Sequence, residues 1–371
     1  MDADAFALAD ELGPARIIHV TEPTIGLRGI LVVDNVAIGP SIGGLRMAPD
    51  VTLEECFRLA RAMTLKNAAA GLPHGGGKSV LRADPSREAT QKERLIRGMA
   101  YTLRHEQGYI FGPDMGTDER CMAWIKDEIG QSVGLPRELG GIPLDEIGAT
   151  GWGMRHATEI ALPMLGIDIS GVRIAVQGFG AVGRHYARFL HDLGAVLVAA
   201  SDTGGTLYGR GGLDVDELIG LKRAGRSVTD ALAGERLSGD AIIDVDCEIW
   251  VPAARPDVVT RANVDRLSAR LVVEGANIPL TDEAERILHQ RGVMVLPDFI
   301  ANAGGVICAA MEYHGATEGE VFATIAEKIR ANTDEMLTTS RREQTTPREA
   351  ALRLAVGRVT RAMQTRRWSL L

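Results

Sequence analysis

A glycine-rich motif between two β-rich runs constrains the fold more than any other segment. The run at 172–177 is followed by Gly178-Phe179-Gly180-Ala181-Val182-Gly183, then by a helical stretch and a second run that ends near Asp202. In such a motif the first glycine makes a tight turn, the second lets a phosphate approach the backbone, and the third brings the helix close to the strand. A carboxylate at Asp202 would accept a ribose hydroxyl and repel a 2′-phosphate. The segment therefore predicts a dinucleotide site and favours NAD over NADP, with a ligand-free glycine turn as the alternative.

Short apolar runs alternate with helical patterns through the second half of the chain. They lie at 172–177, 195–200, 248–251, 271–274 and 293–296. Such alternation is typical of a doubly wound parallel sheet. The glycine-rich stretch 138–153 lacks periodicity and marks a hinge between domains. We therefore expect an α/β protein of two domains, with a Rossmann domain over 141–337 and an α/β substrate and oligomerisation domain with a mixed sheet over 1–140 plus 338–371.

Turn and capping residues predict the elements of the N-terminal domain. Two β-rich stretches between Gly29 and Gly39 are joined by Asp34-Asn35, a pair that suits a tight hairpin turn. Thr52, followed three residues later by Glu55, is a capping box for a helix over 52–70. We also expect helices over 92–107, 318–340 and 347–367, and a short buried strand at 109–111.

Charge and composition exclude several classes of protein. The formal net charge is −8, which argues against an extended nucleic-acid surface, because such a surface needs a basic face. The four dispersed cysteines show no CxxC or Cys/His spacing, so neither a zinc site nor a disulfide framework is predicted. No basic leader or apolar run of roughly 18 residues is present. We therefore expect a cytoplasmic protein with no metal and no membrane partner.

Two lysines stand in an unusual setting. The chain has six lysines against 35 arginines, yet Lys66 and Lys78 lie in a segment without any acidic residue between Glu55 and Asp84. Their neighbours are alanines and glycines, which indicates partial burial, and a buried lysine exchanges protons more readily near neutral pH. Partly exposed structural lysines are the alternative.

Two other lysine chemistries fit the sequence less well. A phosphate-binding loop needs a glycine six residues before Lys78, and Leu72 occupies that position. A pyridoxal-phosphate lysine would leave the dinucleotide motif unexplained. Asp114, which precedes Met115-Gly116, reads alone as a turn residue.

Seven motifs together resemble the glutamate, leucine, valine and phenylalanine dehydrogenase family over nearly the whole chain. They are GGLRMAP at 43–49, MTLKNAAAGLPHGGGK at 63–78, GPDMGT at 112–117, ATGWG at 149–153, GFGAVG at 178–183, EGAN at 274–277 and PDFIANAGGV at 297–306. The resemblance implies an NAD-dependent enzyme that converts an L-amino acid to its 2-oxo acid and ammonia. It also implies a homo-oligomer.

The resemblance assigns roles to individual residues. It implies that Lys66 binds the substrate α-carboxylate, that Lys78 is the catalytic lysine, and that Asp114 exchanges protons with the substrate amine. Asn302 is expected at the nicotinamide end, within reach of the substrate. The remaining residues expected along the dinucleotide, besides those of the glycine motif and Asp202, are Thr150, Ala253 and Asn277.

Specificity is predicted from departures from the glutamate enzymes. Glutamate-specific relatives place a lysine directly before the GG of the GGLR motif, and this chain has Ile42. They place a serine after the NAGGV motif, and this chain has Ala309. An unpaired carboxylate in an apolar pocket is costly. With Gly112 and Val306, these residues predict an apolar pocket of the leucine, valine or phenylalanine type, to which the chain length is also closer.

Other features leave alternatives open. Several motifs, including ATGWG and EGAN, look closer to the glutamate enzymes, so a glutamate dehydrogenase is one alternative and a non-catalytic NAD-binding homologue is another. His74, four residues before Lys78, departs from the family pattern. It is read as a structural histidine, with contact to a polar substrate atom as the alternative.

Overall fold

The computed structural model describes residues 5–366 and divides into two compact units. Unit 1 comprises residues up to Pro143 together with 306–321 and the chain from 352 onward, and unit 2 comprises 144–305 and 322–351. The expected substrate domain ended at 140 and resumed at 338. Residues 1–4 and 367–371, which it included, lie outside the described residues.

Side-chain contacts explain where the division departs from those bounds. Glu312, inside the expected Rossmann range, accepts hydrogen bonds from the backbone N–H groups of Gly134 and Leu135 at 2.8 and 3.1 Å, which ties its helix to unit 1. Arg348, inside the expected substrate range, binds Glu274 of unit 2 at 2.7 Å. The chain therefore crosses between the units more often than the sequence pattern suggested.

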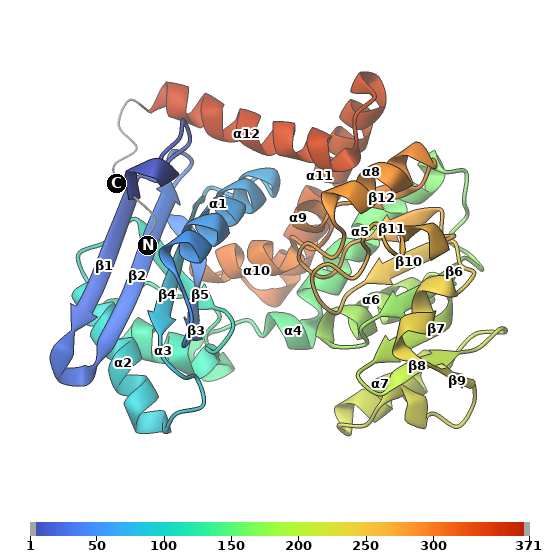
Figure 1. Cartoon of the computed structure of the whole chain (residues 1–371), viewed down its shortest axis with the longest axis horizontal. Coiled ribbons are helices and arrows are strands. Elements are labelled where there is room, and N and C mark those ends of the chain that lie inside the picture. The colour runs from blue at the N-terminus through green and yellow to red at the C-terminus, as the bar shows by residue number, and fades with distance from the viewer. Residues whose placement is uncertain (1–4, 367–371) are drawn as a thin grey trace. The chain divides into compact units, whose positions relative to one another are not determined.

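Unit 1 contains a mixed five-stranded sheet in the order β1-β2-β4-β3-β5 (Figure 1). The strands are β1 (Arg16–Glu22), β2 (Leu27–Asn35), β3 (Ser41–Ala48), β4 (Gly75–Arg82) and β5 (Tyr109–Pro113). β1 with β2 and β2 with β4 are antiparallel, whereas β3 is parallel to both β4 and β5. The predicted mixed sheet is confirmed.

The expected hairpin turn at Asp34-Asn35 is wrong, because both residues belong to β2. The buried carboxylate of Asp34 accepts hydrogen bonds from Arg61 at 2.8 Å and from Thr64 at 2.6 Å. Asn35 donates to the carbonyl of Leu12 at 2.6 Å. These polar side chains bind helix α1 (Leu53–Ala69) and the segment before β1. In the sequence, however, an Asp-Asn pair looks the same whether it forms a turn or makes such contacts.

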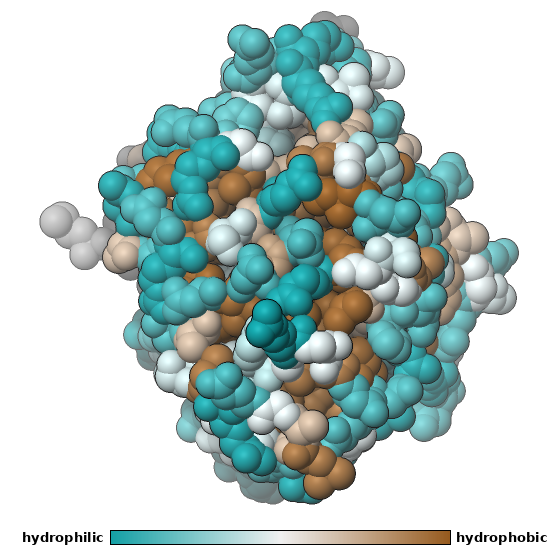
Figure 2. Space-filling model, turned by 90° about the vertical axis from the view of Figure 1, so that its right-hand side faces the viewer, coloured by the Kyte–Doolittle hydropathy of each residue, from teal (hydrophilic) through white to brown (hydrophobic). Residues whose placement is uncertain are grey.

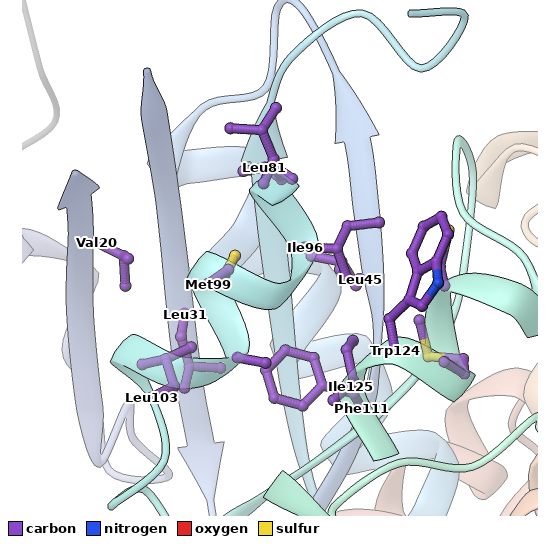
Figure 3. Packing of buried hydrophobic residues seen from close by; sticks show 14 of the residues in the cluster. Val20, Leu31, Leu45, Leu81, Ile96, Met99, Leu103, Phe111, Trp124 and Ile125 are labelled. Atoms are coloured by element: carbon purple, nitrogen blue, oxygen red, sulfur yellow. The ribbon is translucent and has the colours of Figure 1, made fainter. Parts of the chain in front are cut away.

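Three helices cover the two faces of this sheet. α1 (Leu53–Ala69) packs on one face against Val32 and Val80, and Thr52 caps it by accepting from the Glu55 N–H, as predicted. α2 (Ala89–Thr102) and α3 (Glu119–Ile129) cover the other face. Figure 3 shows this larger core, in which strand side chains such as Leu31 and Leu45 face helix side chains such as Met99.

Unit 2 contains a seven-stranded sheet in the order β12-β11-β10-β6-β7-β8-β9 (Figure 1). The strands are β6 (Arg173–Gln177), β7 (Val196–Asp202), β8 (Gly205–Tyr208), β9 (Glu235–Leu237), β10 (Ile249–Pro252), β11 (Leu271–Val273) and β12 (Met294–Leu296). All five expected strands are present and mutually parallel. The sequence missed β8 and β9, short antiparallel strands that extend one edge.

The helices of unit 2 include α5 (Ala149–Met164), α6 (Ala181–His191), α7 (Val215–Arg223) and α8 (Asp282–Gln290). The shorter helices α4 (Leu144–Ile147) and α9 (Asp298–Ala301) also belong to it. α10 (Gly304–Tyr313), α11 (Glu318–Glu343) and α12 (Pro347–Thr365) each contribute residues to both units.

One face of the molecule, seen in Figure 2, mixes polar and apolar side chains. Such mixing is typical of a protein surface in contact with water, since more than half of that surface is normally apolar. Within residues 5–366 no helix combines the length and the apolarity needed to cross a membrane.

Candidate functional site

Glycines bring α1 unusually close to β4 in unit 1. A Cβ atom added at Gly76 of β4 would lie 1.9 Å from the backbone nitrogen of Thr64 in α1. Between the neighbouring strands β3 and β4, a Cβ at Gly43 would lie 1.8 Å from the carbonyl oxygen of Gly77. Neither position can hold a side chain at these distances. The last turns of α1, which carry the half-buried Lys66, therefore lie directly on the strand that carries Lys78.

Strand alternation gathers several predicted residues on the face that α1 covers. Leu45 of β3 and Phe111 of β5 belong to the core on the opposite face. Because successive side chains alternate, Ile42 and Gly112 belong to the α1 face. The register pairs Gly44 with Gly112, so two glycines lie side by side there and leave the floor of the site bare. Ile42 is buried, at 4% exposure.

An ion pair joins the two predicted catalytic residues. Lys78 Nζ lies 2.6 Å from Asp114 Oδ2, and their side chains are 7% and 23% exposed. Arg46 Nε lies 3.1 Å from the same oxygen, and the Arg46 guanidinium also binds Glu55 at 2.6 Å. Burial alone would raise the pKa of Asp114, but Lys78 and Arg46 outweigh it and hold that pKa below its usual value. The site therefore keeps an ionised carboxylate between two cations.

Two residues of this arrangement were missed by the sequence reasoning. A Cβ at Gly44 would lie 3.0 Å from Lys78 Nζ and 2.7 Å from Asp114 Cβ, so only glycine leaves room for the pair. Arg46 orients the Asp114 carboxylate from the neighbouring strand. Both stand in the GGLR motif, which was the available signal, but neither was assigned a role.

His74 is a fully enclosed histidine with defined partners. Its Nδ1 lies 3.0 Å from the carbonyl oxygen of Pro40 and must donate to it, which makes Nε2 an acceptor. His314 Nε2 lies 3.1 Å from this atom and is therefore the donor. Burial lowers the pKa of His74, with His314 adding to the effect and Pro40 opposing it. Both contacts are within the protein, which supports the structural reading.

The remaining predicted pocket residues lie on α10 in unit 1. Val306 and Ala309 are three residues apart, hence on one helix face, and both are half-buried. Asn302 lies in unit 2, separate from this group. The predicted substrate residues other than Asn302 thus share one unit.

The glycine motif forms the turn between β6 and α6 in unit 2, as predicted. Gly178 has a φ of 94°, and a Cβ there would lie 2.8 Å from the Ala253 backbone. A Cβ at Gly183 would lie 2.1 Å from the carbonyl oxygen of Gly178, whereas one at Gly180 would meet nothing within 4 Å. Two glycines are therefore required by packing, and the third faces open space at the start of α6.

This open turn fits the pyrophosphate of a dinucleotide. Gly180 is the N-cap of α6, so the unpaired N–H groups of the first helical turn, with Ala181 and Val182, are available to an anion. Phe179 is fully buried and its backbone N–H donates to the Ser201 carbonyl at 2.9 Å, so this residue is held within the protein rather than offered to a ligand. The buried Oδ1 atom of Asn302 has no hydrogen-bond partner, which adds a polar group for a ligand.

Three other predicted dinucleotide residues also lie in unit 2. Ala253 follows β10 and contacts Gly178 as described, and the Asn302 amide donates to Asn277 Oδ1 at 3.2 Å. Thr150 stands in the first turn of α5, with its Oγ1 3.1 Å from the Cβ position of Gly305. Unit 2 thus contains all the predicted cofactor residues, and Ala253 lies against the glycine turn.

Asp202 ends β7 as expected, but its carboxylate is fully engaged. Oδ2 accepts from Lys222 Nζ at 2.6 Å and the Val228 N–H at 3.0 Å, and Oδ1 accepts from Ser227 Oγ at 2.7 Å and the Gly204 N–H at 2.9 Å. Burial would raise the pKa of Asp202, but Lys222 and the other donors lower it. Because Lys222 offsets its charge, Asp202 repels a 2′-phosphate less than the sequence implied.

Both parts of the chain are similar to the same family of known proteins. Residues 140–367 match the glutamate/leucine/phenylalanine/valine dehydrogenase family, and residues 14–131 match the dimerisation domain of Glu/Leu/Phe/Val dehydrogenases. An NADP(+)-dependent glutamate dehydrogenase of Pyrobaculum calidifontis is 38% identical over 96% of this chain and 92% of its own length. An NAD-specific glutamate dehydrogenase of Staphylococcus aureus is 36% identical over 96% of this chain and 90% of its own.

A solved structure shows the same fold. The hetero-hexameric glutamate dehydrogenase of Thermus thermophilus, in its leucine-bound form, superposes with a TM-score of 0.83 at 31% identity. The match covers 95% of this chain and 90% of that one. These relatives are glutamate dehydrogenases, so they do not support the expectation that the chain stands nearer the leucine, valine and phenylalanine enzymes.

Proposed function

The chain belongs to the glutamate/leucine/phenylalanine/valine dehydrogenase family and is an NAD(P)-dependent amino-acid dehydrogenase. We propose that it catalyses the oxidative deamination of an L-amino acid to its 2-oxo acid and ammonia. The observation that carries the proposal is the 2.6 Å pair of Lys78 and Asp114, an amine and a carboxylate that can exchange protons in a water-poor setting.

Each of the three residues has a distinct role. Lys66, at the end of α1, binds the α-carboxylate and fixes the amino acid. Asp114, kept ionised by Arg46, takes a proton from the substrate ammonium, so that the amine nitrogen can push electrons toward Cα. The Lys78 ammonium first gives up a proton to solvent, and its neutral amine then takes a proton from the water that attacks the iminium carbon and returns it to the departing amine. A bound NAD or NADP would supply the hydride acceptor for this reaction.

Unit 2 supplies the residues that would hold this cofactor. The open turn at Gly180 and the first N–H groups of α6 would hold the pyrophosphate, and Asn302 would offer its Oδ1 atom. Relatives with NAD and with NADP are both found, and Lys222 beside Asp202 is compatible with either. We therefore propose assays with both cofactors, with NAD as the first candidate because Asp202 is present.

Two substrate classes follow from different observations. The relatives described above are glutamate dehydrogenases, which favours glutamate. Ile42 and Ala309 favour an apolar amino acid instead, since they replace the lysine and serine expected to hold a side-chain carboxylate, and Ile42 is buried on the α1 face. Such a pocket leaves a glutamate carboxylate unpaired at a cost of roughly several kcal/mol.

A panel of amino acids tests both the chemistry and the substrate. Reduction of NAD and NADP is followed by absorbance with leucine, valine, phenylalanine and glutamate. Lys78→Ala should lower kcat by about 10²-fold or more, whereas Lys126→Ala, which removes an exposed lysine of α3, should not. Full activity of Lys78→Ala would overturn the assignment. No reduction with any amino acid would favour a non-catalytic dinucleotide-binding protein.

One substitution separates the two substrate classes. Ile42→Lys places an ammonium where glutamate enzymes are expected to have one, so it should raise kcat/KM for glutamate and lower it for leucine. If the unmodified protein already prefers glutamate, the apolar reading is wrong. We also propose a homo-oligomer, which the match to a dimerisation domain supports and which light scattering can measure.

A further inference from the structure

A four-residue loop borders the proposed dinucleotide site of unit 2. The loop Gly275–Ile278 follows β11, and a Cβ added at Gly275 would lie 3.1 Å from the Cβ atom of Ala253 and 3.2 Å from Cγ1 of Val182. Val182 belongs to the first turn of α6. The loop is therefore packed against the same turn that would receive the pyrophosphate.

The loop contains a residue in an unfavourable backbone conformation. Ile278 has a φ of 49°, a region that β-branched residues rarely adopt because Cβ approaches the backbone too closely. Its N–H donates to Asp298 Oδ2 at 2.9 Å, and its carbonyl accepts from the Asp257 N–H at 3.0 Å. Such conformations persist only where the surroundings hold them, and Asp298 is one of the groups that does so.

Asp298 belongs to a buried ionic cluster centred on Arg348. The three guanidinium nitrogens of Arg348 contact Glu285 at 2.6 Å, Glu274 at 2.7 Å and Asp298 at 3.0 Å. Glu274 also accepts from the Asp298 N–H at 2.8 Å. The cluster therefore holds both ends of the loop. Glu274 immediately precedes the loop in sequence, and Asp298 accepts a hydrogen bond from Ile278, its last residue.

The cluster has more carboxylates than cations. Glu274 is fully buried, and it faces Arg348 of α12, Glu285 of α8 and Asp298 of α9. Burial, together with Glu285 and Asp298, raises the pKa of Glu274 well above its usual value, against the attraction of Arg348. Its Oε1 atom is buried and has no hydrogen-bond partner among the described residues. Among the described residues, Arg348 is the cation that contacts all three acidic side chains of this cluster.

We propose that Arg348 is a positioning residue for the dinucleotide, because it anchors Glu274 and Asp298 and thereby holds the loop Gly275–Ile278 in its strained backbone. The inference rests on the proposed assignment of this loop, through Asn277, to the cofactor site. Loss of the anchor releases the strain, and the loop relaxes away from the conformation that borders α6. Binding of the cofactor then has to restore the strained conformation, which weakens its affinity.

The test measures affinity for NADH directly, by fluorescence titration, in the full-length protein. Asp298→Asn removes one of the acceptors for Ile278 and Arg348 while keeping the side-chain shape, and it should weaken NADH binding about tenfold. Arg348→Met should weaken it at least as much if the variant folds. Arg266→Met is the matched control, since Arg266 also binds two carboxylates of unit 2, Asp240 and Asp244, but on the exposed surface.

A rescue variant separates positioning from a general loss of stability. Glycine adopts a positive φ without penalty, so Ile278→Gly in the Asp298→Asn background should recover part of the NADH affinity. A fall in melting temperature with unchanged NADH affinity in Asp298→Asn would overturn the inference. Failure of the unmodified protein to bind NADH or NADPH would instead remove the proposed function, so the two failures are distinguishable.

Discussion

Replacing Gly44 by alanine should lower kcat about 10²-fold while leaving the fold intact. The added methyl carbon would stand 2.7 Å from Asp114 Cβ and 3.0 Å from Lys78 Nζ, on the floor of the site. Carbon atoms normally approach no closer than about 3.5 Å, so the pair must move by about 0.8 Å. A misplacement of roughly 1 Å at a reacting centre can lower the rate about 10²-fold, or about 2.7 kcal/mol in activation free energy.

The assay compares kcat of Gly44→Ala with that of a second glycine variant. Gly29→Ala adds a methyl group to β2 on the opposite face, where its nearest neighbour is the flexible sulfur end of Met99 at 2.9 Å. Both variants crowd a buried strand, but only the first displaces the ion pair. A kcat for Gly44→Ala equal to that of Gly29→Ala would refute the reasoning.

Three further predictions concern proton balance and the cofactor turn. Because Arg46 helps to hold the pKa of Asp114 below its usual value, Arg46→Met should move the acidic limb of the kcat/KM pH profile to higher pH. Gly183→Ala, with its methyl group 2.1 Å from the Gly178 carbonyl oxygen, should abolish NADH binding in a fluorescence titration. Because the folded pKa of Glu274 lies above its ordinary value of 4.5, the stability linked to this proton is present below that pH and is lost as pH rises from it to the raised pKa. Glu274→Gln should therefore make the melting temperature less dependent on pH above 4.5.

The sequence predicted those parts of the fold that local patterns specify. The five parallel strands of unit 2 and the glycine turn were read correctly, since buried runs and turn glycines have direct physical requirements. The hairpin at Asp34-Asn35 was wrong because a polar pair that resembles a turn is bonded to Arg61, 27 residues away. Contacts over that range leave no local pattern in the chain.

Some residues of the candidate site were predicted from the sequence, and others depend on contacts that the sequence does not reveal. Lys78 and Asp114 were named from the resemblance, and the structure places them 2.6 Å apart. Gly44 and Arg46 were missed because their importance depends on strand register, which places Gly44 beside Lys78 Nζ and Arg46 on the same Asp114 oxygen that Lys78 contacts. Asp202 was interpreted from its position alone, and the four donors that surround it come from segments up to 26 residues further along.

The resting ion pair has a consequence for how tightly substrates appear to bind. In the free protein the Asp114 oxygen already contacts the ammonium of Lys78, so an amino acid that binds Asp114 as proposed would compete with an internal cation for the same carboxylate. The measured KM then includes the work of separating that pair and understates the strength of the final contacts. A ligand without a positive charge avoids this competition and leaves the ion pair of Lys78 and Asp114 in place.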